Sequence, residues 1–223
     1  LVVLVPARRG VFNTDGTALA VAILAVALTA ASLGAFFDLK AGFCNAICPV
    51  LPVERLYGQH PLLAVDNPRC TPCTMCTPRA CIDLAAAKSV AQVLGRARRS
   101  HAWLTTAYGI FAAAFPGFVI GYYLTEDGPL AAIGSVYLTV AAWAAGSYLV
   151  ANGLVRVLRV DAAWALPALA AVAVGCYYWF AAPVVSTALG AAAAGTVAIR
   201  TAAFALLAVW AWAAVRRPGV REP

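Results

Sequence analysis

The twenty residues 18–37, ALAVAILAVALTAASLGAFF, contain no charged side chain and decide the class of fold. A run of about 20 apolar residues forms a helix long enough to cross the hydrocarbon core of a bilayer. Of all 223 residues, 63% are hydrophobic and only 11% are charged. A soluble domain of this length could not bury so much apolar surface. The composition therefore excludes a water-soluble enzyme and a disordered chain, and it predicts an all-α polytopic membrane protein.

Three more uncharged runs follow in the C-terminal half of the chain. Residues 102–125 and 128–155 each have the length of one membrane helix, whereas residues 162–199 are too many for one helix. This last run provides two helices only if the second continues past Arg200 to Val215. We therefore predict about five transmembrane helices.

Turn-forming residues mark the break within the last run. Pro183 and Gly190 flank a Ser-Thr pair, and this composition suits a turn. The final helix is then expected to begin between Ala191 and Thr196. If it begins near Thr196, Arg200 extends to the outer interface. If it begins near Ala191, the guanidinium is buried and would bind a partner carboxylate, a lipid or a quinone oxygen.

The second predicted helix carries signs of close packing. Gly117 and Gly121 are four residues apart and follow Pro116, so we expect a close helix crossing with a kink. Trp103 and the tyrosines 122–123 bracket the helix at a separation of about 28 Å, which suits two membrane interfaces.

The basic residues predict the orientation in the membrane. The polar segment 38–100 holds eight Lys or Arg residues. If the helices alternate in direction, five further arginines share its side: Arg156, Arg159, Arg216, Arg217 and Arg221. That side then holds 13 of the 16 basic residues, eight plus five, and is expected to face the cytoplasm of a bacterium across its inner membrane. The net charge of +7 follows from this topology and does not indicate a nucleic-acid partner.

Arg8 and Arg9 are an exception to this charge rule, because they fall on the side of the acidic turn at Glu126 and Asp127. The chain begins inside an apolar run at Leu1, and a further span upstream that sets the orientation would explain the exception. We divide the chain into an N-terminal segment with the first helix, a polar cytoplasmic segment and a four-helix membrane region: residues 1–37, 38–100 and 101–223.

Six of the seven cysteines lie in the polar segment. They form two patterns, Cys44-x3-Cys48-Pro49 and Cys70-x2-Cys73-x2-Cys76-x4-Cys81. A reducing compartment disfavours disulfides, and zinc prefers cysteine pairs separated by a longer loop. Successive two-residue gaps match the opening of a bacterial ferredoxin run, in which the backbone curls around one cube of iron and sulfide. The spacing thus favours a [4Fe–4S] cluster over zinc or structural thiols.

These motifs resemble those of the membrane polyferredoxin family, over about residues 17–125. The family includes the quinol-oxidising iron–sulfur subunit of periplasmic nitrate reduction, and relatives serve nitrous-oxide respiration and oxidase assembly. The resemblance implies a ferredoxin-like iron–sulfur loop between helices one and two, with quinone and other redox subunits as partners. This chain departs from the family in having one copy of each motif, and in placing Cys81 after four residues and before Ile82.

The cysteines can be divided between ligand sets in two ways. In two-cluster ferredoxins the cysteine before proline binds the other cluster. By that rule the ligands of one complete cluster are Cys48, Cys70, Cys73 and Cys76. The two remaining cysteines, Cys44 and Cys81, then lie together at a degenerate second site. Alternatively, Cys81 is the fourth ligand, because it lies close to the expected start of the helix at residues 84–99, whose dipole would favour a thiolate. We favour Cys48, and expect one cluster with a second possible.

The remaining polar residues argue against other functions. His60 and His101 both lie outside the predicted spans, so haem held between helices by paired histidines is not expected. The spans contain no Asp or Glu, which transporters of ions or protons normally need. Residues 84–99 are expected to form an interfacial helix whose basic end meets anionic lipid or an acidic redox partner.

No nucleophile–base set, nucleotide-binding glycine loop or flavin motif is evident in the sequence. We therefore expect a non-catalytic electron-transfer subunit of an oxidoreductase complex, which relays electrons between the quinone pool and a partner redox subunit. An iron–sulfur assembly, maturation or redox-sensing membrane factor is the alternative that the family relatives imply.

Overall fold

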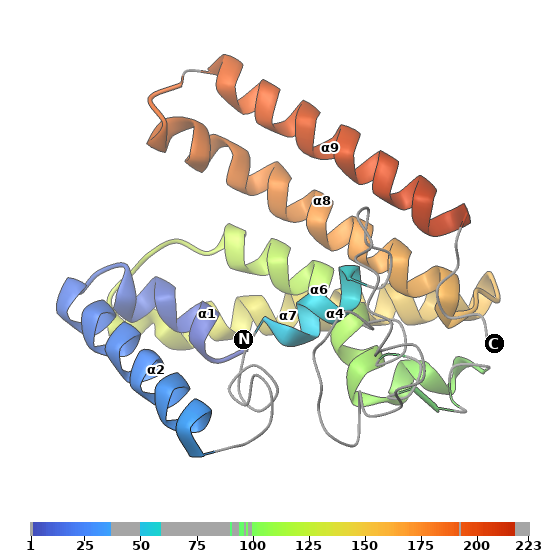
Figure 1. Cartoon of the computed structure of the whole chain (residues 1–223), viewed down its shortest axis with the longest axis horizontal. Helices are drawn as coiled ribbons and strands as arrows, with labels where there is room; N and C mark the ends of the chain where they lie inside the picture. The colour runs from blue at the N-terminus through green and yellow to red at the C-terminus, as the bar shows by residue number, and fades with distance from the viewer. Residues whose placement is uncertain are drawn as a thin grey trace.

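The computed structural model describes residues 2–36, 50–58, 90, 94–95, 97, 100–191 and 193–216. Within these residues it contains five helices long and apolar enough to cross a membrane (Figure 1). They are α2 (Gly16–Phe36), α6 (Ala107–Leu124), α7 (Ile133–Val157), α8 (Ala162–Ala188) and α9 (Ala193–Arg216). The prediction of a helical, multi-pass membrane protein with about five spans is confirmed.

Short elements connect or flank these spans. A helical turn and a π-helix precede α2, a short helix follows the first part of the polar segment, and two 3-10 turns begin the spans α6 and α7. They are α1 (Leu4–Ala7), η1 (Arg8–Phe12), α4 (Leu51–Tyr57), η3 (His101–Thr105) and η4 (Leu130–Ala132).

Helices α6 and α7 pack at backbone distance, as the glycine pair predicted. A Cβ atom added to Gly117 would lie 2.0 Å from the backbone oxygen of Trp143, and one added to Gly121 would lie 2.9 Å from the Cα of Val140. The hydroxyl of Ser147 donates a hydrogen bond of 2.8 Å to the carbonyl of Ala113 across the same contact. Small residues and a buried hydroxyl are the usual means of joining helices in lipid, where apolar faces alone gain little from meeting.

Helices α8 and α9 form an antiparallel hairpin (Figure 1). The turn lies between Ala188 and Ala193, and Gly190 adopts a φ of +66°, which glycine accepts without strain. The predicted start of the last helix is correct. The placement of Pro183 in the turn is wrong, because Pro183 and the Ser-Thr pair lie inside α8.

A buried core lies at the end of the bundle where α6 and α8 begin. Trp103 and Leu104 of η3 are fully buried there, together with Leu56 of α4 and Leu166 of α8. Trp103 does precede α6, as expected, but its ring faces the protein core and is not a lipid-facing interface anchor. The Trp103 side chain therefore packs between helices in the core.

The expected helix at residues 84–99 is described at only a few positions. Val90 and Leu94 are both in helical conformation, and both are buried in the same core as Trp103 and Leu104. Gly95 has a φ of +51°, the left-handed conformation in which helices commonly end.

Candidate functional site

The six cysteines of the predicted cluster site lie outside the described residues, as does His60: Cys44, Cys48, Cys70, Cys73, Cys76 and Cys81. Among the residues that are described, no group of three or more His, Cys, Asp or Glu side chains comes together. Cys176 is described and lies half-buried within α8. His101 begins η3, just before α6, as expected.

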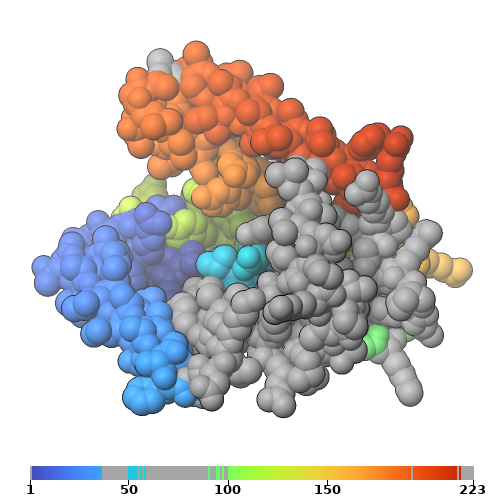
Figure 2. All heavy atoms as spheres, in the orientation of Figure 1, coloured from blue at the N-terminus to red at the C-terminus, as the bar shows by residue number. Residues whose placement is uncertain are grey.

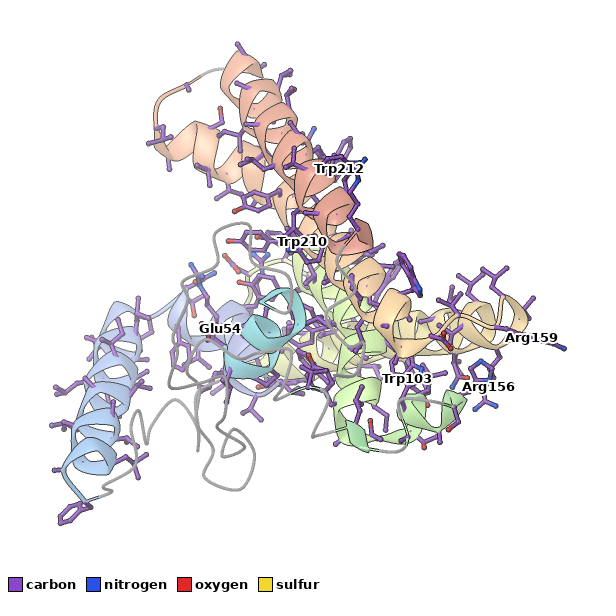
Figure 3. The ribbon with its side chains drawn as sticks, turned by 45° about the vertical axis from the view of Figure 1, so that its right-hand side comes forward. Glu54, Trp103, Arg156, Arg159, Trp210 and Trp212 are labelled. Atoms are coloured by element: carbon purple, nitrogen blue, oxygen red, sulfur yellow. The ribbon has the colours of Figure 1, made fainter. Side chains whose placement is uncertain are left out.

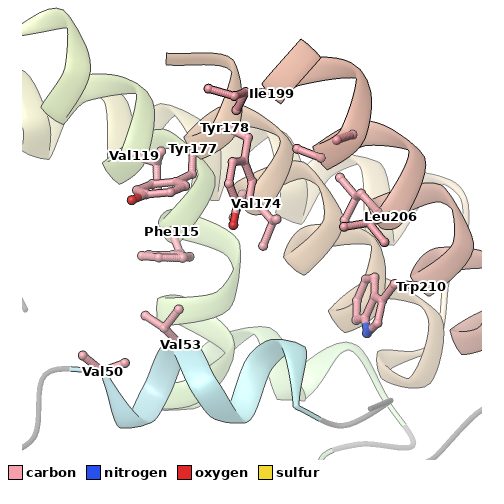
Figure 4. A pocket seen from close by; sticks show the side chains of 14 residues that line it. Val50, Val53, Phe115, Val119, Val174, Tyr177, Tyr178, Ile199, Leu206 and Trp210 are labelled. Carbon is pink, nitrogen blue, oxygen red and sulfur yellow. The ribbon is translucent and has the colours of Figure 1, made fainter. Parts of the chain in front are cut away.

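The described residues instead outline an apolar groove of about 950 Å³ (Figure 4). Phe115 and Val119 of α6 form one wall, Tyr177 and Tyr178 belong to α8, and α9 supplies the opposite wall, which includes Trp210. Figure 2 shows the molecule hollowed between the α8–α9 hairpin and the helices below it. The walls of the groove are therefore helices suited to a membrane.

One end of the groove is closed by α4. Val50 and Val53 line it there, beneath Phe115 of α6 (Figure 4). Val50 is two residues after Cys48 in the sequence. A molecule in the groove would therefore contact the segment that directly follows the Cys-Pro motif.

Two phenol groups give the groove its polar character. Tyr177 and Tyr178 are 48% and 40% exposed, and their rings meet edge to face with centroids 5.3 Å apart. Tyr177 also contacts Tyr123 of α6, at 6.1 Å between centroids. Within the part of the chain that the structure describes, neither Tyr177 nor Tyr178 donates its hydroxyl proton to the protein.

Arg200 is held by α8, in neither of the two ways that the sequence left open. Pro183 has no N–H to bond the carbonyl four residues earlier, which belongs to Trp179. Arg200 supplies the missing donors from α9: its Nε and Nη2 atoms lie 3.1 and 2.7 Å from that carbonyl oxygen. Its guanidinium also stacks on the Trp179 ring, at 4.0 Å from the centroid. Arg200 thus supplies the hydrogen-bond donors that Pro183 removes from α8.

Arg9, one of the two exceptional arginines near the N-terminus, has an acidic partner. Arg9 pairs with Asp127 at 2.9 Å, donates to the carbonyl of Tyr122 at 3.2 Å and lies over the Tyr122 ring. Asn13 donates to both carboxylate oxygens of Asp127 at 3.0 Å. Burial alone would raise the pKa of Asp127, but the hydrogen bonds from Arg9 and Asn13 outweigh it and hold the pKa below its ordinary value. The positive charge of Arg9 is therefore neutralised by the carboxylate of Asp127.

The other predicted basic groups lie where the helix order requires. Arg156 is in the last turn of α7 and Arg159 follows this helix, and both lie at the end of the bundle that carries Trp103 (Figure 3). Arg216 ends α9 and stacks on Trp212, at 3.8 Å from the ring centroid. These arginines belong to the end opposite the Arg9–Asp127 pair.

Comparison with protein-family models, with curated proteins and with solved structures gave no match. Five helices in the part of the chain that the structure describes are suited to a lipid bilayer, and the chain belongs to the class of multi-pass membrane proteins. Sequence reasoning missed the groove. The available signal was the adjacent pair Tyr177 and Tyr178 in the middle of an uncharged run, where tyrosine is less usual than at the interfaces.

Proposed function

We propose that the protein is a membrane-anchored iron–sulfur subunit that relays electrons between the quinone pool and a partner redox subunit. The observation that carries this proposal is the run Cys70-x2-Cys73-x2-Cys76, with Cys48-Pro49 upstream, in a chain built on membrane spans. Soft thiolates in this spacing suit a [4Fe–4S] cluster, with Cys48 or Cys81 as the fourth ligand. Such a cluster would supply one-electron transfer.

The proposed location is the inner membrane of a bacterium, with the cysteine segment in the cytoplasm. The count of basic residues supports this orientation, and Arg9, one of the two arginines that oppose it, is paired with Asp127. A reporter that is active only in the cytoplasm, fused after Arg221, is expected to be active. Activity of a reporter that works only in the periplasm, at the same position, would contradict the orientation and the count of spans.

The function is tested by reduction of the cluster in lipid nanodiscs. After anaerobic purification, addition of a quinol is expected to produce the EPR signal of a reduced [4Fe–4S] cluster. Cys73→Ser should abolish the signal, and Cys176→Ser, which changes a cysteine inside α8, should leave it intact. A cluster that chemical reductants reduce and quinol does not would contradict the quinone role.

A second measurement concerns the partner and the fourth ligand. A stoichiometric complex with a redox subunit is expected on gentle purification. A labile cluster in a chain that is substoichiometric to any respiratory complex would instead favour the assembly or redox-sensing role. Within the electron-transfer account, Cys48→Ser is expected to disturb the cluster signal more than Cys81→Ser does.

A further inference from the structure

We infer that the groove between α6, α8 and α9 is the binding site for a quinone, with the Tyr178 hydroxyl donating a hydrogen bond to a ring carbonyl. The choice of a quinone rests on the proposed function. The site itself rests on the geometry of the described residues, which can be tested independently of the cysteines.

The size and surroundings of the groove suit a small membrane-soluble molecule. Its volume of about 950 Å³ is at the upper end of ordinary ligand pockets, which span roughly 300–1,000 Å³. Val119, Val174 and Leu206 give it the apolar lining that a ring and the start of an isoprenoid chain require. A ligand can enter sideways from the bilayer, because the groove is bounded by spanning helices.

The depth of Tyr177 and Tyr178 in the membrane indicates which polar group a ligand of the groove must carry. Tyr177 lies 15 residues after Ala162 and 11 residues before Ala188. At about 1.5 Å per residue it is roughly 16 Å from the nearer end of α8, which is near the middle of a hydrocarbon core of about 30 Å. A hydroxyl there has no water to bond, and an unpaired polar group in hydrocarbon is costly.

This depth distinguishes between classes of lipid. The ester and phosphate oxygens of a phospholipid belong to the interface, so they do not provide an acceptor at mid-depth. A quinone is uncharged, and its carbonyl oxygens can accept hydrogen bonds inside the hydrocarbon region. The Tyr178 side chain extends into the space between α6 and α9 (Figure 4), where such a ring would lie.

The site also lies beside the segment that follows the Cys-Pro motif. Val50 and Val53 of α4 close the groove, and the sequence places Val50 two residues after Cys48. A ligand in the groove thus contacts a helix that is continuous in sequence with a proposed cluster ligand.

Photolabelling of the full chain in phospholipid nanodiscs tests the site. The probe is an azido-substituted ubiquinone, and the competitor is decylubiquinone. We expect labelled peptides from α8 and α9 and loss of label with competitor. Tyr178→Phe should weaken labelling about 2- to 13-fold, the value of one hydrogen bond. Ala203→Phe, which fills the groove, should nearly abolish it, whereas Ala205→Phe on an exposed position of α9 should not.

Three outcomes would overturn the inference: equal labelling of wild type and Ala203→Phe, label confined to helices other than α6, α8 and α9, or competition by added phospholipid equal to that by decylubiquinone. The Cys73→Ser variant separates this inference from the proposed function, because it should lose the cluster signal and keep the label. If quinol reduces the cluster while the groove is not labelled, the proposed function stands and this site is wrong.

Discussion

The two sides of α6 are packed in opposite ways. Toward α7, Gly117 and Gly121 bring two backbones together so closely that a single added methyl group has no room. Toward α9, Phe115 and Val119 of the same helix line a groove of about 950 Å³. Both faces are apolar, so hydropathy does not distinguish them.

The difference shows that side-chain size decides whether a helix face packs against a neighbouring helix or leaves space for a ligand. Small residues let helices touch, and a touching pair can be fixed by one hydroxyl, as Ser147 fixes α7 to Ala113 of α6. Large aromatic residues hold helices apart and leave space that a lipid-soluble molecule can fill. The following variants test each side of this comparison.

The largest effect is expected on the closed side, from Gly117→Ala. Its Cβ would meet the backbone oxygen of Trp143, which cannot move without displacing α7. We expect a loss of more than about 3 kcal/mol in the free energy of unfolding, at the upper end of overpacking effects. Thermal unfolding in detergent, followed by circular dichroism, measures it. Gly146→Ala in α7 is the matched control, because nothing lies within 4 Å of the added Cβ. Equal melting temperatures for the two variants would show that the closed contact is absent.

The next effect concerns the hairpin that forms the open side. Arg200→Ala removes the donors to the Trp179 carbonyl and leaves that oxygen unpaired. We expect a loss of about 1–3 kcal/mol, the cost of an unsatisfied polar group. Pro183→Ala restores the helical N–H that α8 lacks, so the arginine becomes less necessary.

A double-mutant cycle between these two positions makes the test specific. In the Pro183→Ala background, Arg200→Ala should cost clearly less than in the wild type, as expected for coupled residues. Additive costs would mean that Arg200 does not compensate for the proline.

The smallest effect is expected at the opposite end, from Asp127→Asn. Asp127 is 44% exposed and pairs with Arg9, so its contribution is within about 1 kcal/mol. Because its folded pKa is lowered, the stabilisation is complete above the unfolded pKa and is lost as the pH falls through the folded value. The melting temperatures of wild type and variant should differ at pH 7 and converge once the pH has fallen through the folded pKa. A difference that persists unchanged in acid would exclude the ion pair as its source, and Glu126→Gln is the neighbouring control.

The sequence predicted the spans well, since the bilayer requires long uncharged runs and only helices satisfy the backbone there. Gly117 and Gly121 also predicted the close crossing of α6 with another helix, because two small residues four apart can be recognised within one segment. The partner of Arg200 could not be predicted from neighbouring residues. Pro183 was interpreted as a turn residue, but a membrane helix tolerates proline when another helix supplies the missing donor.

The groove could not be predicted for a related reason. Its lining comes from α4, α6, α8 and α9, and its volume depends on how far apart these helices stand. No single segment carries that information, and only the tyrosine pair gave a local sign. The cysteine site, in contrast, depends on spacing along one segment, and its chemistry was proposed from the sequence alone.

The metal content of the purified chain tests the central claim most directly. After anaerobic purification, iron and acid-labile sulfide should each approach about four per chain, as one [4Fe–4S] cluster requires. Serine at Cys70, Cys73 and Cys76 together should remove both, whereas Cys176→Ser should change neither. Zinc in place of iron, or a chain that folds and inserts with neither iron nor sulfide, would contradict the account.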